Sequence, residues 1–141
     1  MMQDNVPQVL IIDDLDQSRH LLRSLLEQQG FRVEVTSDGF TGLERLRASR
    51  QPLVAAISNV LTDFTAAQLL QRVVAEPDLA RRHAYILMTL APEAARRTLK
   101  RAQVQLPVLL LENPHDLERL CGAIREAAAR LQQTHSALTV H

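Results

Sequence analysis

The chain has 141 residues, enough to bury the core of one domain but too few for two ordinary domains. Its 16 basic and 16 acidic residues are interspersed and give a formal net charge of zero, which argues against a nucleic-acid or membrane-surface partner. The single cysteine, Cys121, excludes an internal disulfide framework and a multi-cysteine zinc site. No apolar run approaches the ~20 residues of a membrane span, and the N-terminus lacks a basic signal-peptide start, so we expect a cytoplasmic protein.

Apolar runs of strand length alternate with segments of helical periodicity along the chain. In chain order, strands are predicted over residues 8–13, 31–37, 52–58, 84–89 and 106–112. The first helix is predicted from Asp16, as its N-cap, to Gly30 just past its end, and Pro92 is predicted to open the helix after the fourth strand. Because the strands are apolar enough to be covered on both faces, this order predicts a parallel sheet flanked by helices.

Each predicted helix carries an apolar stripe that is expected to pack on the sheet. The stripes are formed by Leu21, Leu22, Leu25 and Leu26 in the first helix, Phe40, Leu43 and Leu46 in the second, Leu69, Leu70, Val73 and Val74 in the third, and Leu117, Leu120, Cys121, Ile124, Ala128 and Leu131 in the last. The closing residues THSALTVH are expected to form a frayed tail.

The residues that end the strands are the candidates for a functional site, because ligands of an open parallel sheet bind outside the carboxyl ends of its strands. Asp13 and Asp14 follow the first strand. Two like charges this close destabilise a fold unless a positive partner or the chemistry of the site requires them. The other strand-end residues are Ser58 and Asn59 after the third strand, Thr89 after the fourth, and Glu112 and Asn113 after the fifth.

Four stretches follow the pattern of a known family: LIIDDLDQSRHLLRSLLEQQGFRVEVTSDG, the paired leucines of AAQLL, the run ILMT and the proline of ENP. On these residues, the chain resembles the receiver domain of two-component response regulators from Val9 to about Leu131. The resemblance implies a flavodoxin-like α/β fold, a doubly wound five-stranded parallel sheet with strand order 2-1-3-4-5. The implied organisation is an N-terminal extension over 1–8, a receiver domain over 9–131 and a C-terminal tail over 132–141.

The resemblance also implies a role for the adjacent aspartates. Receiver domains accept a phosphoryl group from a histidine kinase on an aspartate that ends the third strand, with Mg²⁺ held by that aspartate, an acid pair and a backbone carbonyl. A hydroxyl ending the fourth strand and a lysine ending the fifth bind the phosphoryl oxygens. By resemblance, Asp13 and Asp14 are the acid pair and Thr89 is the hydroxyl of the switch. The cation would offset the repulsion between the carboxylates.

Two of the departures from the family pattern remove groups that phosphotransfer uses. Counted back from AAQLL, the phosphoacceptor position falls on Ser58, or on Asn59 with a shift of one residue, and neither side chain forms an acyl phosphate. The lysine position falls on Asn113, and the only lysine of the chain, Lys100, lies on the helix after the fourth strand. Asp63 is acidic but lies farther along the loop, and it carries little weight as an acceptor.

These departures predict an atypical receiver domain that is not an enzyme and acts through protein contacts without phosphotransfer. No cofactor is required on this interpretation. Two alternatives stay open for Asp13 and Asp14: they bind Mg²⁺ weakly, or they form a solvated pair stabilised by nearby helix N-termini.

A protein partner, or a second copy of the chain, is expected to bind across the helix after the fourth strand, the fifth strand and the last helix. Basic side chains gather on the first of these helices, and the last helix carries Glu118 and Glu126, so the surface is self-complementary under a two-fold axis. A solvated charged face explains the same pattern nearly as well. The basic residues are Arg96, Arg97, Lys100 and Arg101.

A second hypothesis is an enzyme. The run after the first strand also contains Asp14, Asp16 and Ser18 at alternate positions, which is similar to the first motif of haloacid-dehalogenase-type phosphatases. There the first aspartate is the nucleophile and the second is the general acid and base. The hypothesis is weaker than the receiver interpretation, because Asp16 is also explained as a helix N-cap and the chain is too short for a cap domain.

Overall fold

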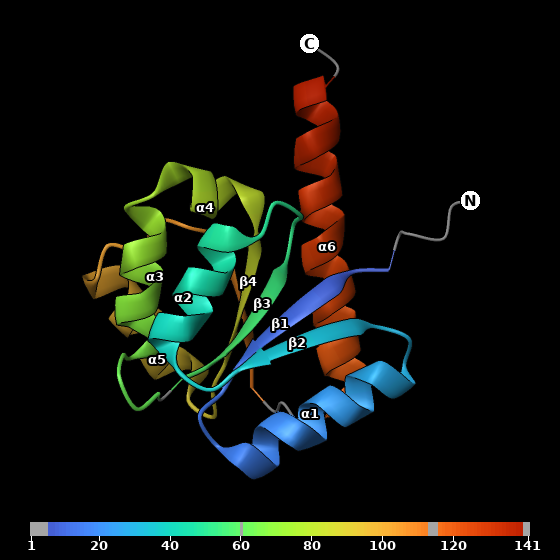
Figure 1. Cartoon of the computed structure of the whole chain (residues 1–141). Helices are drawn as coiled ribbons and strands as arrows, with labels where there is room; N and C mark the ends of the chain where they lie inside the picture. Colours follow the sequence, from blue (N-terminus) through green and yellow to red (C-terminus); the bar gives the residue numbers. More distant parts are fainter. Residues whose placement is uncertain (1–5, 60, 113–115, 140–141) are drawn as a thin grey trace.

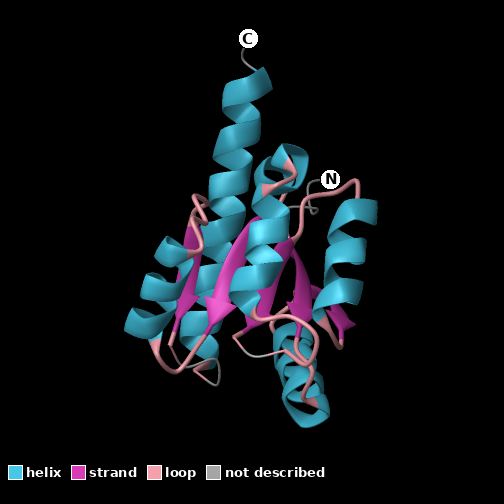
Figure 2. Ribbon diagram, turned by 90° about the vertical axis from the view of Figure 1, so that its left-hand side faces the viewer, coloured by secondary structure: helices cyan, strands magenta, loops and turns pink. Residues whose placement is uncertain are grey.

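The structure is a computed structural model that describes residues 6–59, 61–112 and 116–139, with side chains through residue 132. Five strands form one sheet in which every pairing is parallel, in the order β2-β1-β3-β4-β5 (Figures 1 and 2). This confirms the fold class and strand order expected from the sequence. The strands are β1 (Gln8–Ile12), β2 (Arg32–Thr36), β3 (Val54–Ser58), β4 (Ala84–Met88) and β5 (Val108–Leu111).

Helices cover both faces of the sheet (Figure 1). Two apolar cores result, one between the sheet and α1 with α6, and the other between the sheet and α2, α3, α4 and α5. The short helix α4 is an addition to the helices predicted from the sequence. The helices are α1 (Asp16–Gln28), α2 (Gly39–Ala48), α3 (Ala66–Val74), α4 (Pro77–Arg82), α5 (Pro92–Arg101) and α6 (Leu117–Thr139).

The central strand β1 explains why the sequence shows continuous apolar runs. Val9 and Ile11 point into the core under α1 and α6, whereas Leu10 and Ile12 point into the other core. All four side chains are fully buried, so a polar residue at any of these four positions would lose apolar burial. The edge strand β2 is more exposed, as its alternating sequence predicts.

Several helix ends follow the local sequence. Thr65 and Gln68 form a capping box at the start of α3, in which each side chain bonds the backbone N–H of the other residue. Asp38 caps α2 by accepting a hydrogen bond from the N–H of Thr41 at 2.7 Å. Gly30 follows α1 with φ of 93°, a left-handed conformation that favours glycine.

The N-cap prediction for the first helix is wrong. Leu15 is the N-cap, without a side-chain cap bond, and Asp16 is the first helical residue. The physical reason is that helical hydrogen bonding starts at Leu15, whose carbonyl accepts from the N–H of Arg19 at 2.9 Å, while the Asp16 carboxylate forms an ion pair with the Arg19 side chain. The helix therefore begins one residue earlier in its hydrogen-bond pattern than its composition suggests.

Two apolar residues assigned to helix stripes are not core residues, and one expected tail is helical. Leu21 and Phe40 are 45% and 58% exposed, because each lies on the outward flank of its helix. Helix α6 continues through Thr139, where the stretch THSALTVH was expected to be a frayed tail, since no glycine or proline interrupts it. Its C-terminal part projects beyond the sheet (Figure 1).

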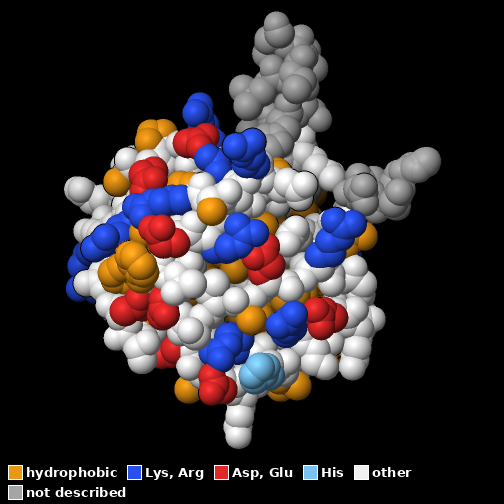
Figure 3. All heavy atoms as spheres, viewed as in Figure 1, with side chains coloured by type: hydrophobic (Ala, Val, Ile, Leu, Met, Phe, Trp, Pro, Cys, Tyr) orange, Lys and Arg blue, Asp and Glu red, His pale blue; other side chains and the backbone are white. Residues whose placement is uncertain are grey.

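Charges of both signs are interspersed on the face that carries α2 and α3, and no large patch of one sign stands out there (Figure 3). Within the described ranges, none of the helices combines the length and the apolar character needed to cross a bilayer.

Candidate functional site

The carboxyl edge of the sheet brings together the strand-end residues singled out in the sequence. Asp13 and Asp14 from the end of β1, Ser58 from the end of β3 and Thr89 after β4 all line one cavity of about 530 Å³. This convergence follows from the strand order, since β1, β3 and β4 are neighbours in the sheet. Asn113, the residue at the lysine position, lies outside the described residues.

Asp13 is the most tightly held residue of the site. It is 2% exposed, and its Oδ1 accepts a hydrogen bond from the N–H of Leu15 at 3.0 Å. Its own N–H donates to the carbonyl of Thr36 at 3.1 Å, which ties it to the end of β2. Asp14 is half-buried beside it. The buried carboxylate thus has a fixed orientation before any ligand is bound.

Arg19 supplies a positive charge beside the acid pair that sequence reasoning missed. Its Nη1 donates to the backbone carbonyl of Asp13 at 2.9 Å, and its Nη2 forms an ion pair with the Asp16 carboxylate. The Arg19 side chain is only 12% exposed. The spacing of Asp16 and Arg19, three residues apart on a helix, was the available signal. This guanidinium places one positive charge near the two adjacent aspartates.

Thr89 occupies the position that the resemblance gives to the hydroxyl. It is 3% exposed, and its N–H donates to the carbonyl of Leu111 at 2.9 Å. Its Oγ1 accepts a hydrogen bond from the N–H of Ala91 at 3.0 Å. The hydroxyl is therefore engaged in the turn after β4.

Ser58 ends β3 opposite Met88 in the register of β4 and is half-buried. The next residue, Asn59, is exposed and donates its N–H to the carbonyl of Met88 at 3.1 Å. Both residues line the cavity. Neither residue supplies a carboxylate, so the described lining contains only the two carboxylates from β1.

Asp63 lies outside this cavity and has a structural role. Its carboxylate accepts hydrogen bonds from the N–H groups of Gly39 and Phe40, both at 2.8 Å, and of Phe64 at 2.9 Å. Burial raises the pKa of Asp63, but these backbone hydrogen bonds together outweigh burial and lower the pKa below its ordinary value. A Cβ on Gly39 would lie 2.5 Å from Cδ2 of Phe64, so a larger residue there would force the Phe64 side chain to shift.

The donor set is a poor match for a tightly bound Mg²⁺. In the part of the chain that the structure describes, no group of three or more His, Cys, Asp or Glu side chains is placed to hold a metal ion. One carboxylate oxygen of Asp13 already accepts a hydrogen bond from the N–H of Leu15, and Ser58 offers a neutral hydroxyl. Mg²⁺ requires near-octahedral oxygen ligands and gives up its waters reluctantly, and the two carboxylates supply only part of such a ligand set.

The phosphatase hypothesis finds no support in this arrangement. Asp14 lines the cavity, whereas Asp16 does not. The Asp16 side chain is 80% exposed and is paired with Arg19 on the surface of α1. A nucleophile and its general acid must reach the same substrate, and these two carboxylates do not share a pocket.

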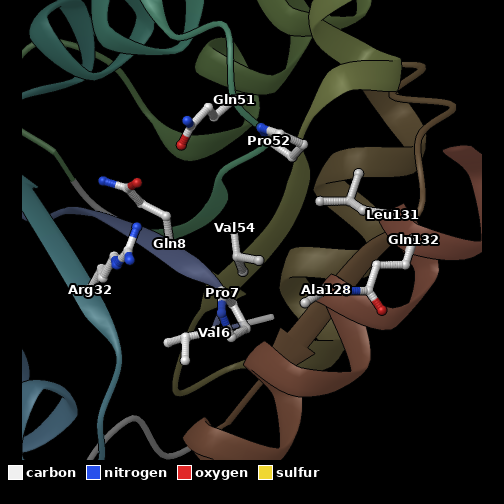
Figure 4. Close-up of a pocket in the computed structure, with 10 residues that line it drawn as sticks. All are labelled: Val6, Pro7, Gln8, Arg32, Gln51, Pro52, Val54, Ala128, Leu131 and Gln132. Carbon is white, nitrogen blue, oxygen red and sulfur yellow. The ribbon is translucent and has the colours of Figure 1, made fainter. Parts of the chain in front are cut away.

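A second cavity, of about 320 Å³, lies at the opposite, amino edge of the sheet (Figure 4). Among the described residues, its polar lining consists of amides and one guanidinium, without a carboxylate. It is lined by Val6, Pro7, Gln8, Arg32, Gln51, Pro52, Val54, Ala128, Leu131 and Gln132. None of the strand-end candidates borders it.

No protein-family model matches this sequence, and no curated protein matches it. Solved structures do. An adenylate cyclase from Rhodopirellula baltica matches with a TM-score of 0.75 and 16% identity over 96% of this chain and 96% of that chain. The receiver domain of a sensor histidine kinase from Pseudomonas aeruginosa, with a magnesium ion coordinated in its active site cleft, matches with a TM-score of 0.73 and 16% identity over 88% of this chain and 98% of that chain.

The signal receiver domain of an HD domain-containing protein from Pseudomonas fluorescens matches with a TM-score of 0.71 and 20% identity, over 99% of this chain and 96% of that chain. The fold is the receiver-domain fold. At these identities the likeness establishes the fold, while the activity has to be argued from the site.

Proposed function

We propose that this chain is an atypical receiver domain of two-component signalling that acts through protein contacts and does not carry out phosphotransfer. The observation that carries the proposal is Ser58 at the end of β3, in the same cavity as Asp13, Asp14 and Thr89. The receiver-domain fold supports the signalling role, and the composition of this cavity supports the lack of phosphotransfer.

The chemistry of the acceptor position is the first support. Phosphotransfer in receivers forms an acyl phosphate on a carboxylate, a high-energy bond that a serine phosphate does not reproduce. The residues described as lining the cavity with Ser58 include no histidine, the base that most often activates a serine nucleophile. Asp63, the other acid near this loop, is occupied by the N-terminus of α2.

The second support is electrostatic. The family chemistry uses a cation and a lysine to balance three carboxylates and the incoming phosphoryl group. Here the sequence has asparagine at position 113, and the Arg19 guanidinium is directed at the Asp13 carbonyl and the Asp16 carboxylate. We propose that no cofactor is required and that Mg²⁺ binds the acid pair only weakly.

The surface for a partner or a second copy is proposed at the β5 edge of the sheet. The groove there, of about 790 Å³, is lined by Arg96, Arg97 and Lys100 from α5 and by apolar residues of the edge strand β5. Arg96 is paired with Glu93, whereas no ion pair joins Arg97, Lys100 or Arg101 to another described residue. An apolar strand beside unpaired cations favours an acidic, partly apolar partner surface.

The metal and acceptor arguments are tested together by beryllofluoride, a mimic of a phosphoryl group bound to a carboxylate. With Mg²⁺ and beryllofluoride, we expect no shift of the amide resonances of Thr89 and Ala91 in the wild-type chain. Ser58→Asp is the matched variant, since it restores the third carboxylate, and Ser58→Ala is the control. Saturable shifts at Thr89 in the wild-type chain would overturn the proposal.

A further inference from the structure

The cavity at the carboxyl edge has an apolar wall in addition to its acid pair. Five large hydrophobic side chains are exposed among the described residues, and two of them, Leu15 and Leu90, line this cavity. Leu15 is 65% exposed and Leu90 is 82% exposed. Met88 and Ala91 continue the apolar wall between them. The two leucines thus form an uncovered apolar rim.

The charge of the cavity is negative. Asp13 and Asp14 are its only charged residues among the described lining, and the other polar residues there are neutral hydroxyls and an amide. Arg19 is close to Asp13, but its guanidinium contacts the backbone carbonyl and the Asp16 carboxylate and does not line the cavity. The site therefore attracts a cation, and the nature of the cation is decided by the rest of the lining.

The apolar rim separates two kinds of cation. A hydrated metal ion needs more oxygen ligands than two carboxylates and gains nothing from exposed leucines. A lysine or arginine side chain combines a charged head with an apolar stem, so it uses both parts of the cavity. A volume of about 530 Å³ is sufficient for such a side chain with an apolar neighbour.

We propose that this cavity docks a segment of a partner protein that presents a lysine or arginine side chain beside an apolar residue. The basic head binds the carboxylates of Asp14 and Asp13, and the apolar neighbour covers Leu15 and Leu90. The inference rests on the proposed function in one respect, which is that the cavity is not used for phosphoryl transfer. It adds a binding surface that is separate from the groove between α5 and β5.

The test uses capped tripeptides as probes of the full chain, with the amide resonances as the readout. The first probe is acetyl-Leu-Lys-Leu-amide, and its matched control is acetyl-Leu-Glu-Leu-amide. We expect saturable shifts at Asp14, Leu15 and Leu90 with the lysine probe and a dissociation constant at least ~5-fold lower than that of the glutamate probe. Hexylamine is added in a separate titration to represent a free small amine.

Three variants locate the binding. Leu90→Ala is expected to lower the affinity for the lysine probe about fivefold, because apolar burial is lost. Asp14→Asn is expected to lower it by a similar factor, because a charge is lost. Leu21→Ala, which truncates another exposed leucine of the same chain, is the control and is expected to leave the affinity unchanged. All three sites are half-buried or exposed, so the variants should fold.

The outcomes separate this inference from the proposed function. Equal affinity for the two peptides, an equal loss in Leu21→Ala, or the absence of localised shifts would overturn it. Tight binding of hexylamine without binding of the lysine peptide would also overturn it, in favour of a small-amine site. A phosphoryl adduct on the wild-type chain would overturn the proposed function and leave the peptide result standing.

Discussion

The two ends of the sheet differ in how their polar groups are satisfied. At the amino edge, His83 is 3% exposed, its Nδ1 accepts a hydrogen bond from the N–H of Leu53, and its Nε2 donates to the carbonyl of Leu46, both at 2.9 Å. At the carboxyl edge, Asp13 and Asp14 face a cavity whose rim leucines are exposed. The buried His83 ring is satisfied by backbone groups on both sides, whereas the acid pair faces a cavity with an exposed apolar rim.

A second buried side chain near the amino edge is satisfied in the same way as His83. Tyr85, next to His83 in the fold, likewise donates its hydroxyl to a backbone carbonyl, that of Leu79, at 2.9 Å. Burial raises the pKa of Tyr85 well above its ordinary value, so this donor keeps its proton. His83 and Tyr85 are thus neutral buried groups whose hydrogen bonds go to the backbone, as expected of a structural role. Substitution of His83 should therefore lower the free energy of unfolding, whereas substitution of the exposed rim leucines should change it little.

The largest effect is expected from His83→Ala. The change leaves the N–H of Leu53 and the carbonyl of Leu46 buried without their partner, and the free energy of unfolding should fall by about 3 kcal/mol. Leu90→Ala at the carboxyl edge should change it by less than about 0.5 kcal/mol, since that side chain is 82% exposed. Urea unfolding measures the free energy of unfolding of both variants. Similar losses in the two variants would contradict the difference between the two edges.

The pH dependence of stability sharpens the same comparison. Burial lowers the pKa of His83 from 6.5 to about 4, so between these values the unfolded chain binds a proton that the folded chain does not. Stability is therefore complete above 6.5 and declines as the pH falls toward 4, by about 3 kcal/mol in total. The decline should be absent from His83→Ala. If the stability of the wild-type chain did not change between pH 6.5 and 4, His83 would not be a buried neutral side chain with a lowered pKa.

Asp63→Ala should have an intermediate effect. The carboxylate satisfies the N–H groups of Gly39 and Phe40 at the start of α2, and its removal should cost about 1 kcal/mol, as for a helix cap. Faster amide exchange at Gly39 and Phe40 would locate the loss. Thr62→Ala, in the same exposed loop, is the control. Equal losses in the two variants would show that the loop, and not the carboxylate, is responsible.

The smallest effect on stability is expected at the β5 edge. Arg97→Glu with Arg101→Glu should change the free energy of unfolding by less than about 0.5 kcal/mol, because both side chains are exposed. The same pair of changes should abolish self-association or partner binding that weakens with salt. Sedimentation at low and moderate salt measures this, with Arg50→Glu plus Arg81→Glu as the control. A wild-type monomer at every salt concentration, with partner binding unaffected by the pair, would exclude this surface.

The sheet could be predicted because its signals are local. Strands buried on both faces give continuous apolar runs, and once the order of the strands is known, the meeting of Asp13, Asp14, Ser58 and Thr89 follows from parallel geometry. Leu21 and Phe40 were assigned wrongly because apolar spacing on a helix does not reveal how wide the covered stripe is. Apolar character alone did not separate a core leucine from a rim leucine.

The residues that were missed act through distant backbone groups. His83 bonds to residues 30 and 37 positions away in sequence, and Asp63 reaches the start of α2 across 23 and 24 positions. No spacing rule relates a side chain to such partners, because the fold alone brings them together. Arg19 was the exception, since its pairing with Asp16 is local and was readable from the helix spacing.

The central claim is that the carboxyl edge keeps the acid pair without phosphotransfer. It is tested most directly by the intact mass of the wild-type chain after incubation with acetyl phosphate and Mg²⁺. The account predicts an unchanged mass, because Ser58 stands where an acyl phosphate would form. A hydroxylamine-labile increment of one phosphoryl group, present in the wild-type chain and lost in Asp14→Asn or Asp13→Asn, would contradict it.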